Sequence, residues 1–415
     1  MIARIFILII LAIVLPDLYF DQLYWRRRYR LRLWHRLLWW LPGLVMLVYT
    51  IGLATIRDFV PEDLRVINVY LFIVGMLVIP KALFALCSGL GLLWCRWRHT
   101  HQNWGNVVAV VLIFYTWFVV IYGSVWGCTR LRVHRLELYF DDLPAAFDGY
   151  RIVQISDLHV GSFRGDRLRY LQRNIDSINV QKADLIVFTG DLQNIRPSEI
   201  GPVAPLLRQL KARDGIISIL GNHDYAKYIN EGPVVARRNE TATRAWERRL
   251  GWQLLCNEHV KLYRDHDGRR LNVVTGHTGK GLPTGGLDSI VIAGEENYKK
   301  PSRSDLGKTL RGVGRDAFVV LLQHQPEAWP KEILPTRRVA LTLSGHTHGG
   351  QMSYLGLRPT HILPGSLDYG LYERDGKRLY VNAGLGGLVF FRFNMPAEIT
   401  VFTLRSQQSI KSARH

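Results

Sequence analysis

Cysteine is scarce in this chain, and its placement excludes two kinds of small scaffold. The 415 residues contain four cysteines, and no pair has the spacing of a zinc knuckle or of a redox motif: Cys87, Cys95, Cys128 and Cys256. The first three lie in or beside apolar segments. This usage argues against a disulfide framework and leaves the compartment of the C-terminal region undefined.

Internal repeats and blocks of like charge are also missing. No period of roughly 20 to 50 residues is visible, which argues against a solenoid. The last 279 residues carry 38 Lys/Arg against 29 Asp/Glu, but no block of five like charges. This scattered excess suits either an anionic substrate or lipid surface, or an ordinary solvated surface, and nucleic acid is not an expected partner.

Long apolar runs are abundant in the first third of the chain. A helix needs about 20 apolar residues to cross a bilayer. We therefore interpret residues 1–130 as an all-α transmembrane region of about four helices. No small-x-small cleavage site follows the first run, so we expect it to remain in the mature protein. The spans are expected at approximately 2–20, 37–56, 67–94 and 106–127.

The third apolar run contains one charged residue, Lys81, which follows Pro80. Proline interrupts helical hydrogen bonding, so we expect a kink there. An ionisable residue inside a span is a functional candidate by default. The other spans offer no evident carboxylate for a proton relay, so we favour a structural role for Lys81.

Basic residues beside the apolar runs predict the orientation in the membrane. Residues 1–136 carry 15 Lys/Arg against 5 Asp/Glu, and the first loop alone holds six arginines. Loops rich in Lys and Arg stay in the cytoplasm. We expect a multi-pass protein of the cytoplasmic (inner) membrane, with its C-terminal domain on the outer or periplasmic side. The arginines directly after the last span argue against this orientation: Arg130, Arg132 and Arg135.

Residues 137–415 have a different pattern, in which short β-branched runs alternate with charged helical stretches. This alternation predicts an α/β domain built as a layered sandwich. A glycine-rich hairpin is expected at 276–280. Strands are expected at 151–156, 183–189, 215–220, 317–322 and 339–343, and helices at 166–179 and 241–250.

Each of the five expected strands is followed by carboxylate, amide or imidazole groups. Ligand sites in open α/β sheets gather beyond the carboxyl ends of the strands. Neighbouring glycines let the backbone turn sharply and approach such a site. We therefore expect one site to form from Asp157 and His159, Gly190-Asp191, Gly221-Asn222-His223-Asp224, His324, and Gly345-His346-Thr347-His348.

These five blocks resemble the signature of the calcineurin-like metallophosphoesterases: D-x-H, G-D, G-N-H-[D/E], a lone His and G-H-x-H. The resemblance covers roughly residues 150–400, and the segments 155–161, 345–351 and 384–386 are similar to a bacterial membrane-anchored subgroup. It implies a sandwich of two mixed β-sheets flanked by helices, and a metal-dependent hydrolase. Asn194 departs from the pattern, because relatives often have an acid there, and we expect altered bonding around an intact site.

The resemblance also implies a site for two divalent metal ions, with Asp191 bridging them. Asp157, His159 and His348 would hold one ion; Asn222, His324 and His346 would hold the other. His223 would stabilise the phosphate or protonate the leaving oxygen, with Asp224 orienting its imidazole. The nucleophile would be a metal-bound hydroxide. Such ligands suit manganese, iron or zinc, and the choice among them stays open.

The substrate is less defined than the chemistry. Phosphomonoester, phosphodiester and pyrophosphate bonds all suit this kind of site. Only about ten residues separate Gly127 from the expected first strand near Leu138, a reach of about 35 Å at most. We therefore expect a lipid or cell-envelope phosphate, with the three arginines after the last span lying in the headgroup layer. The alternative is a non-catalytic binding scaffold on the same fold.

Overall fold

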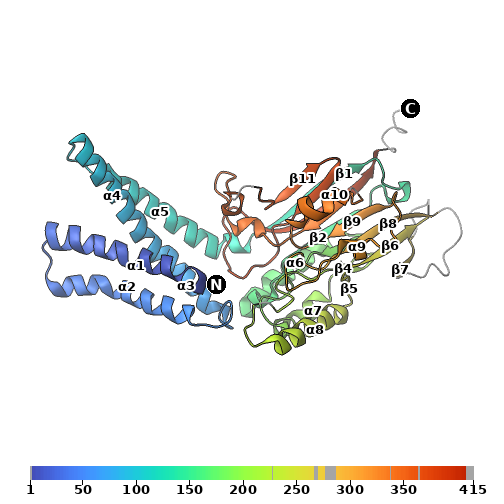
Figure 1. Ribbon diagram of the computed structural model, residues 1–415, viewed down its shortest axis with the longest axis horizontal. Helices are drawn as coiled ribbons and strands as arrows, with labels where there is room; N and C mark the ends of the chain where they lie inside the picture. The colour runs from blue at the N-terminus through green and yellow to red at the C-terminus, as the bar shows by residue number, and fades with distance from the viewer. Residues whose placement is uncertain are drawn as a thin grey trace. The chain divides into compact units, whose positions relative to one another are not determined.

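The computed structural model describes residues 2–226, 228–265, 270–275, 287–336, 338–362 and 365–407. The expected hairpin at 276–280 lies outside these residues. The chain divides into two compact units, Met1–Cys128 and Thr129–His415 (Figure 1). Each unit is described by itself.

The first unit is helical throughout. Four of its helical segments are long and apolar enough to cross a membrane: Phe6–Arg28, Leu33–Ala54, Leu64–Arg98 and Trp104–Thr129. The prediction of four transmembrane helices is therefore confirmed, and the first apolar run is one of them. The segments consist of α1 (Phe6–Tyr19) with η2 (Phe20–Arg28), α2 (Leu33–Ala54), α3 (Leu64–Ile73) with η3 (Val74–Val78) and α4 (Ile79–Arg98), and α5 (Trp104–Val125) followed by η4 (Gly127–Thr129).

The third span is irregular next to Pro80, where the sequence predicts a kink. The π-helical turn η3 ends at Val78, two residues before the proline. Pro80 has no N–H to donate to the preceding turn, and a π-helical turn accommodates such a local break in the α-helical hydrogen bonds.

Lys81 forms an ion pair inside the membrane unit. Its Nζ lies 2.7 Å from Asp17 Oδ1 and 4.4 Å from the centre of the Trp39 ring. Asp17 belongs to α1, so the expectation that the other spans offer no carboxylate was wrong; this residue sits near the end of the first apolar run. Pairing compensates both charges within the helical unit, which supports a structural role for Lys81.

The second unit is a sandwich of two mixed β-sheets, as predicted. The six-stranded sheet has the order β1 (Leu131–Phe140), β13 (Ala397–Ser406), β2 (Arg151–Ile155), β3 (Leu185–Phe188), β4 (Ile216–Ser218) and β5 (Gln253–Leu254). The seven-stranded sheet has the order β11 (Gly370–Arg374), β12 (Lys377–Val381), β10 (Leu341–Ser344), β9 (Phe318–Leu322), β8 (Asp288–Gly294), β6 (Glu258–Arg264) and β7 (Arg270–Thr275).

Apolar side chains cover both faces of the central strands. Ile152 of β2 belongs to the core between the two sheets, whereas its neighbour Val153 packs toward the helices, because successive side chains of a strand point to opposite faces. Strands buried on both faces read as continuous apolar runs, and this explains why they were recognisable in the sequence. The flanking helices are α6 (Leu168–Asn179), α7 (Ala204–Leu207), α8 (Pro233–Arg249), α9 (Leu306–Thr309) and α10 (Leu334–Thr336) (Figure 1).

Strand β1 begins at Leu131, earlier than the strand expected near Leu138. Arg132 and Arg135 therefore belong to the sheet, and residues three apart in a strand point to opposite faces. Arg135 donates to Gln181 Oε1 at 2.8 Å, within the second unit. The expectation that these two arginines and Arg130 lie in the headgroup layer stays a prediction, and the side chain of Arg135 bonds within its own unit.

Candidate metal centre

The loops that follow the strands hold several predicted ligands in a strained backbone conformation. Five of the seven have positive φ: Asp157 (48°), His159 (45°), Asp191 (63°), His346 (75°) and His348 (53°). Residues other than glycine rarely adopt this region, and such strain collects at functional sites. Glycine is required where the loops touch, because a Cβ at Gly221 would lie 2.2 Å from Asp191 Oδ1.

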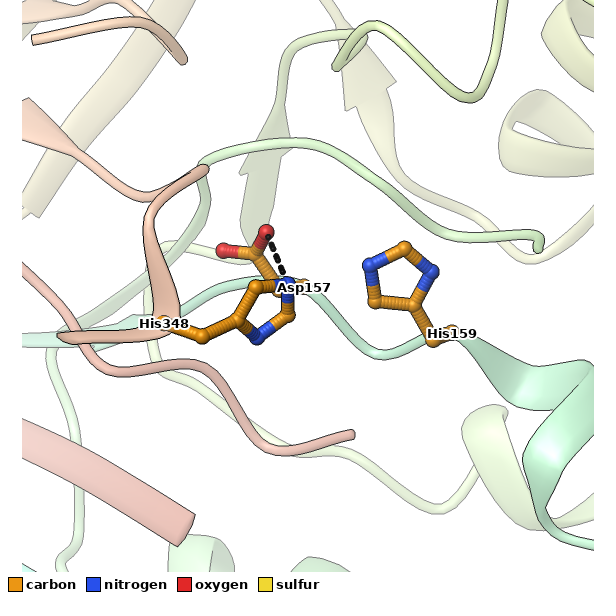
Figure 2. A group of neighbouring side chains, drawn as sticks. All are labelled: Asp157, His159 and His348. Carbon is orange, nitrogen blue, oxygen red and sulfur yellow. Dashed lines mark ion pairs between the residues drawn. The ribbon is translucent and has the colours of Figure 1, made fainter. Parts of the chain in front are cut away.

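Asp157, His159 and His348 come together as one potential metal-ligand group. One ligand atom from each lies within 4.8 Å of the others (Figure 2). His348 Nε2 is 3.4 Å from Asp157 Oδ1. The other oxygen, Asp157 Oδ2, accepts a hydrogen bond from Ser156 Oγ at 2.5 Å, and this bond fixes the orientation of the carboxylate.

Asp191, His324 and His346 form a second group with the same spacing. The predicted ligand Asn222 joins it, because Asn222 Oδ1 lies 3.1 Å from His324 Nε2. His324 Nδ1 lies 2.7 Å from the carbonyl oxygen of Thr189. A backbone contact on one ring nitrogen orients the other nitrogen toward the site, as is usual for metal-binding histidines.

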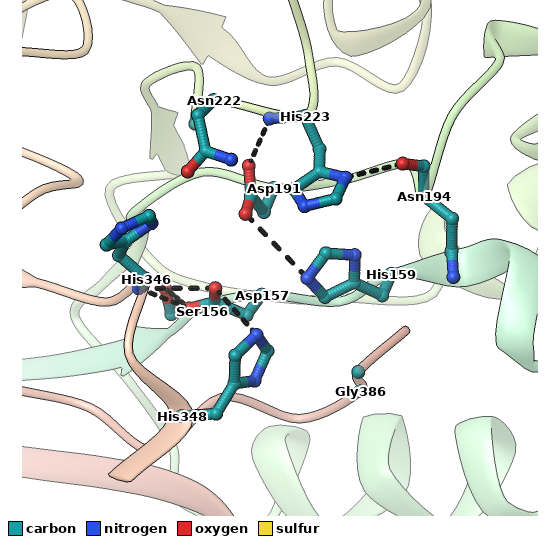
Figure 3. Close-up of polar contacts among 12 residues, drawn as sticks. Ser156, Asp157, His159, Asp191, Asn194, Asn222, His223, His346, His348 and Gly386 are labelled. Atoms are coloured by element: carbon teal, nitrogen blue, oxygen red, sulfur yellow. Dashed lines mark hydrogen bonds and ion pairs between the residues drawn. The ribbon is translucent and has the colours of Figure 1, made fainter. Parts of the chain in front are cut away.

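Asp191 lies between the two groups (Figure 3). Its Oδ2 is 3.7 Å from His159 Nε2 and 3.2 Å from His324 Nε2. Its Oδ1 accepts a hydrogen bond from the backbone N–H of His223 at 2.8 Å. One carboxylate thus reaches histidines of both groups, which is the position expected for a bridging ligand.

Three of the histidines are held in the neutral form that binds metal. Burial lowers the pKa of His159 and of His346 to about 3, and it lowers the pKa of His348 well below the ordinary value. Neutral imidazole is the metal-binding species. The Nδ1 atom of His346 is buried without a hydrogen-bond partner among the described residues. An orphaned buried nitrogen of this kind fits a bound cation.

The carboxylates are crowded in a way that a cation would relieve. Burial raises the pKa of Asp157 to about 7, and the nearby Asp191 acts in the same direction. Burial opposes the charged form of His324, but Asp191 outweighs it and raises the pKa of His324 to about 9. A cation bound among these atoms competes with that proton, because ligands must be deprotonated to bind metal. The donor set therefore fits divalent cations.

Asp224 does not have the role that the sequence suggested. Its carboxylate accepts hydrogen bonds from the backbone N–H groups of Asp191 (2.8 Å), Leu192 (3.0 Å) and Gly221 (2.8 Å). It therefore ties together the two loops that carry Asp191 and Asn222. The imidazole of His223 instead places Nδ1 2.5 Å from the carbonyl oxygen of Asn194 (Figure 3).

Asn194 forms hydrogen bonds within the loops that border the site. Its side-chain amide donates to Ser162 Oγ at 2.9 Å, and its backbone carbonyl contacts His223. The turn is held by Glu199, whose carboxylate accepts hydrogen bonds from the N–H groups of Asn194 (2.6 Å), Ile195 (3.0 Å) and Arg196 (3.1 Å). Sequence reasoning missed Glu199, because it lies outside every motif.

Tyr228 is a second residue that the sequence did not single out. Its hydroxyl oxygen accepts a hydrogen bond from Asn222 Nδ2 at 2.8 Å, and its ring centre lies 4.3 Å from that of His223. The tyrosine therefore orients the amide of Asn222 so that Oδ1 faces His324. Only its position, six residues after Asn222 in the loop that follows β4, pointed to the site.

The fold and the site together define a metal-dependent phosphoesterase, and comparison with known proteins agrees. Residues 150–350 match the family model of the calcineurin-like phosphoesterases. Residues 3–128 match a model described as the transmembrane domain of a probable calcineurin-like phosphoesterase. The chain is 35% identical to the metallophosphoesterase YkuE of Bacillus subtilis over 296 residues, which cover 68% of this chain and 91% of YkuE. The chain belongs to the calcineurin-like metallophosphoesterase family.

Two further relatives are associated with membranes or lipids by their names. A transmembrane protein with a metallophosphoesterase domain from Danio rerio is 28% identical over 299 residues, which cover 71% of this chain and 62% of that protein. The UDP-2,3-diacylglucosamine pyrophosphatase LpxG of Chlamydia muridarum is 28% identical over 309 residues, which cover 65% of this chain and 88% of LpxG. The predictions of the family, the fold and the enzyme class are confirmed.

Proposed function

We propose that this membrane protein uses two divalent cations to hydrolyse a phosphoester or pyrophosphate bond in a membrane lipid or cell-envelope precursor. The observation that carries the proposal is the position of Asp191, whose Oδ2 lies between His159 of one ligand group and His324 of the other. Bound divalent cations supply an acidified water and offset the charge of the phosphate. Manganese, iron and zinc all suit the ligands.

The residues of the chain have separate roles in the proposed reaction: some hold the cations and one transfers a proton. Asp157, His159 and His348 would hold one cation, and Asn222, His324 and His346 would hold the other. His223 is placed by two contacts, from its backbone N–H to Asp191 Oδ1 and from Nδ1 to the Asn194 carbonyl. The opposite side of its ring faces Asp191 and His159. These contacts support our proposal that His223 donates a proton to a leaving oxygen.

Two observations support a substrate in or at the membrane. The name of LpxG describes a pyrophosphatase whose substrate carries acyl groups. In this chain only five residues, 126–130, separate α5 from β1. Five extended residues reach roughly 18 Å. The domain is therefore confined to the neighbourhood of the bilayer, and the arginine-rich first loop favours the outer or periplasmic side of the cytoplasmic membrane.

The test is hydrolysis by the full-length protein in mixed micelles. A lipid phosphate or pyrophosphate is compared with its water-soluble headgroup, before and after chelation and with Mn²⁺ added back. We expect metal-dependent cleavage with a preference for the lipid form, and Asp191→Asn is the inactive control. A clear preference for the soluble headgroup would contradict the lipid substrate. Absence of metal-dependent cleavage, even of a chromogenic phosphodiester, would instead favour the scaffold alternative.

A further inference from the structure

A hairpin that follows the predicted metal ligand His348 exposes large apolar side chains. Tyr354, Leu355 and Leu357 are 49%, 85% and 66% exposed. Reciprocal backbone hydrogen bonds of 2.9 Å between Tyr354 and Leu357 close the hairpin, so that Leu355 stands at its tip. Single exposed apolar residues are ordinary, but a contiguous group of them marks an interaction surface.

A second loop lies beside this hairpin. The N–H of Ser353 donates to the carbonyl of Phe393, and the N–H of Phe393 donates to the carbonyl of Gln351, at 2.8 and 2.9 Å. The same loop contains Phe390, whose ring lies 3.9 Å from the guanidinium of Arg167. We call Tyr354, Leu355 and Leu357 the apolar rim; the neighbouring loop adds the half-buried Phe390 and its cationic partner Arg167.

The apolar rim lies at the edge of the sheet where the polypeptide enters the domain. Leu131, the first residue of β1, pairs with Ala397 of β13. The antiparallel pairing of β13 with β2 ends at Thr400 opposite Gln154, so Ala397 and the predicted metal ligand Asp157 both lie beyond the same end of that pairing. The loop that contains Phe393 leads directly into Ala397. The entry point, the predicted metal ligands and the apolar rim therefore lie at the same end of the strands of the six-stranded sheet.

The short connection to α5 limits how far this end of the strands can lie from the membrane. The entry point is five residues from the end of α5, a reach of roughly 18 Å. We propose that the apolar rim docks on the lipid bilayer, with Leu355 at the boundary between headgroups and acyl chains, so that the metal centre opens at the membrane surface. Apolar and aromatic side chains with a basic neighbour are the composition that suits this boundary. The proposal needs only membrane attachment and holds for a lipid or a soluble substrate.

Fluorescence quenching by lipid tests the proposal on the full-length protein in nanodiscs. Leu355→Cys, in a variant whose four native cysteines are replaced by serine, is labelled with the fluorophore NBD. Val180→Cys is the matched control, because Val180 is a 74% exposed apolar residue at the opposite edge of the sheet, between α6 and β3. If the cysteine-free protein does not fold, both labels are introduced into the native background and the signal of labelled wild type is subtracted.

We expect lipids with a doxyl group on the acyl chain to quench the label at position 355 several-fold more than the label at position 180. Leu357→Cys should behave like Leu355→Cys. Equal quenching at 355 and 180, or none at 355, would overturn the proposal. So would a spectral shift at 355 that depends on protein concentration in lipid-free detergent and is not accompanied by quenching in nanodiscs, because it would indicate a second copy of the chain as the partner. No step involves turnover, so these outcomes are independent of the hydrolysis assay.

Discussion

Replacing Glu199 by Gln should slow catalysis through His223 without removing metal. The Glu199 carboxylate holds the turn that presents the Asn194 carbonyl to the imidazole. Glutamine keeps the size of the side chain but replaces one acceptor oxygen with an NH₂ group, which would face backbone N–H groups. The turn must shift to avoid this, and the carbonyl then loses its alignment with His223.

The size of the effect follows from the bonds that change. A neutral hydrogen bond contributes about 0.5–1.5 kcal/mol, and a bond to a charged group about 1.5–3 kcal/mol. Loss of the contact between His223 Nδ1 and the Asn194 carbonyl therefore corresponds to about a tenfold fall in kcat, since about 1.4 kcal/mol is a factor of ten. The upper limit is set by His223→Ala, for which loss of acid–base help predicts a fall of ~10²–10⁴-fold.

A double-mutant cycle on a chromogenic phosphodiester measures whether the effect passes through His223. Glu199→Gln should lower kcat in the wild-type background and change little in the His223→Ala background, where no imidazole remains to be aligned. Metal content should match wild type in all four proteins. Glu398→Gln is the matched control, because Glu398 is also buried but bonds to Tyr380 and Thr400. Equal losses in both backgrounds, or loss of metal on Glu199→Gln, would refute the reasoning.

Three other perturbations test the site, the orientation and a buried charge. Asp191→Asn keeps shape but removes charge, so most activity and at least one metal ion per chain should be lost on elemental analysis; near-normal turnover with two ions would contradict the bridging role. A C-terminal alkaline phosphatase fusion should be active and a C-terminal fluorescent protein that matures only in the cytoplasm should be dark, and the reverse pattern would place the domain inside. Burial raises the pKa of Glu295 from 4.5 to about 7, so the folded protein binds an extra proton between these values and stability falls as pH rises through them. Glu295→Gln should therefore raise the free energy of unfolding in detergent at pH 8 by at most about 3.4 kcal/mol, and by much less at pH 4.5. An equal increase at both pH values would exclude this cause.

The ligand loops were predictable because each follows a strand that can be recognised locally. Ile155 ends a buried strand two residues before Asp157, and Phe188 ends another three residues before Asp191. A local apolar run, a nearby glycine and the convergence of strand ends are sufficient to predict that these residues lie close together.

Other features depend on pairings between distant parts of the chain. The early start of β1 depends on parallel pairing between Leu131 and Ala397, which no local pattern specifies. The inward turn of Asp224 depends on amide groups at Asp191 and Leu192, in a different loop. Sequence motifs therefore located the groups that carry the chemistry, whereas the contacts that orient them required the structure.

The left-handed backbone at five predicted ligands implies a conflict between foldability and activity. A residue other than glycine in this conformation costs about 1–2 kcal/mol. Five such residues together approach the net stability of an ordinary domain, about 5–15 kcal/mol. In the metal-free chain, Asp157→Gly would relieve backbone strain and remove a buried carboxylate, and the protein would lose a predicted ligand. Selection for stability alone would therefore favour the loss of these residues before others. Glycines at these positions would distinguish a family member that is no longer catalytic.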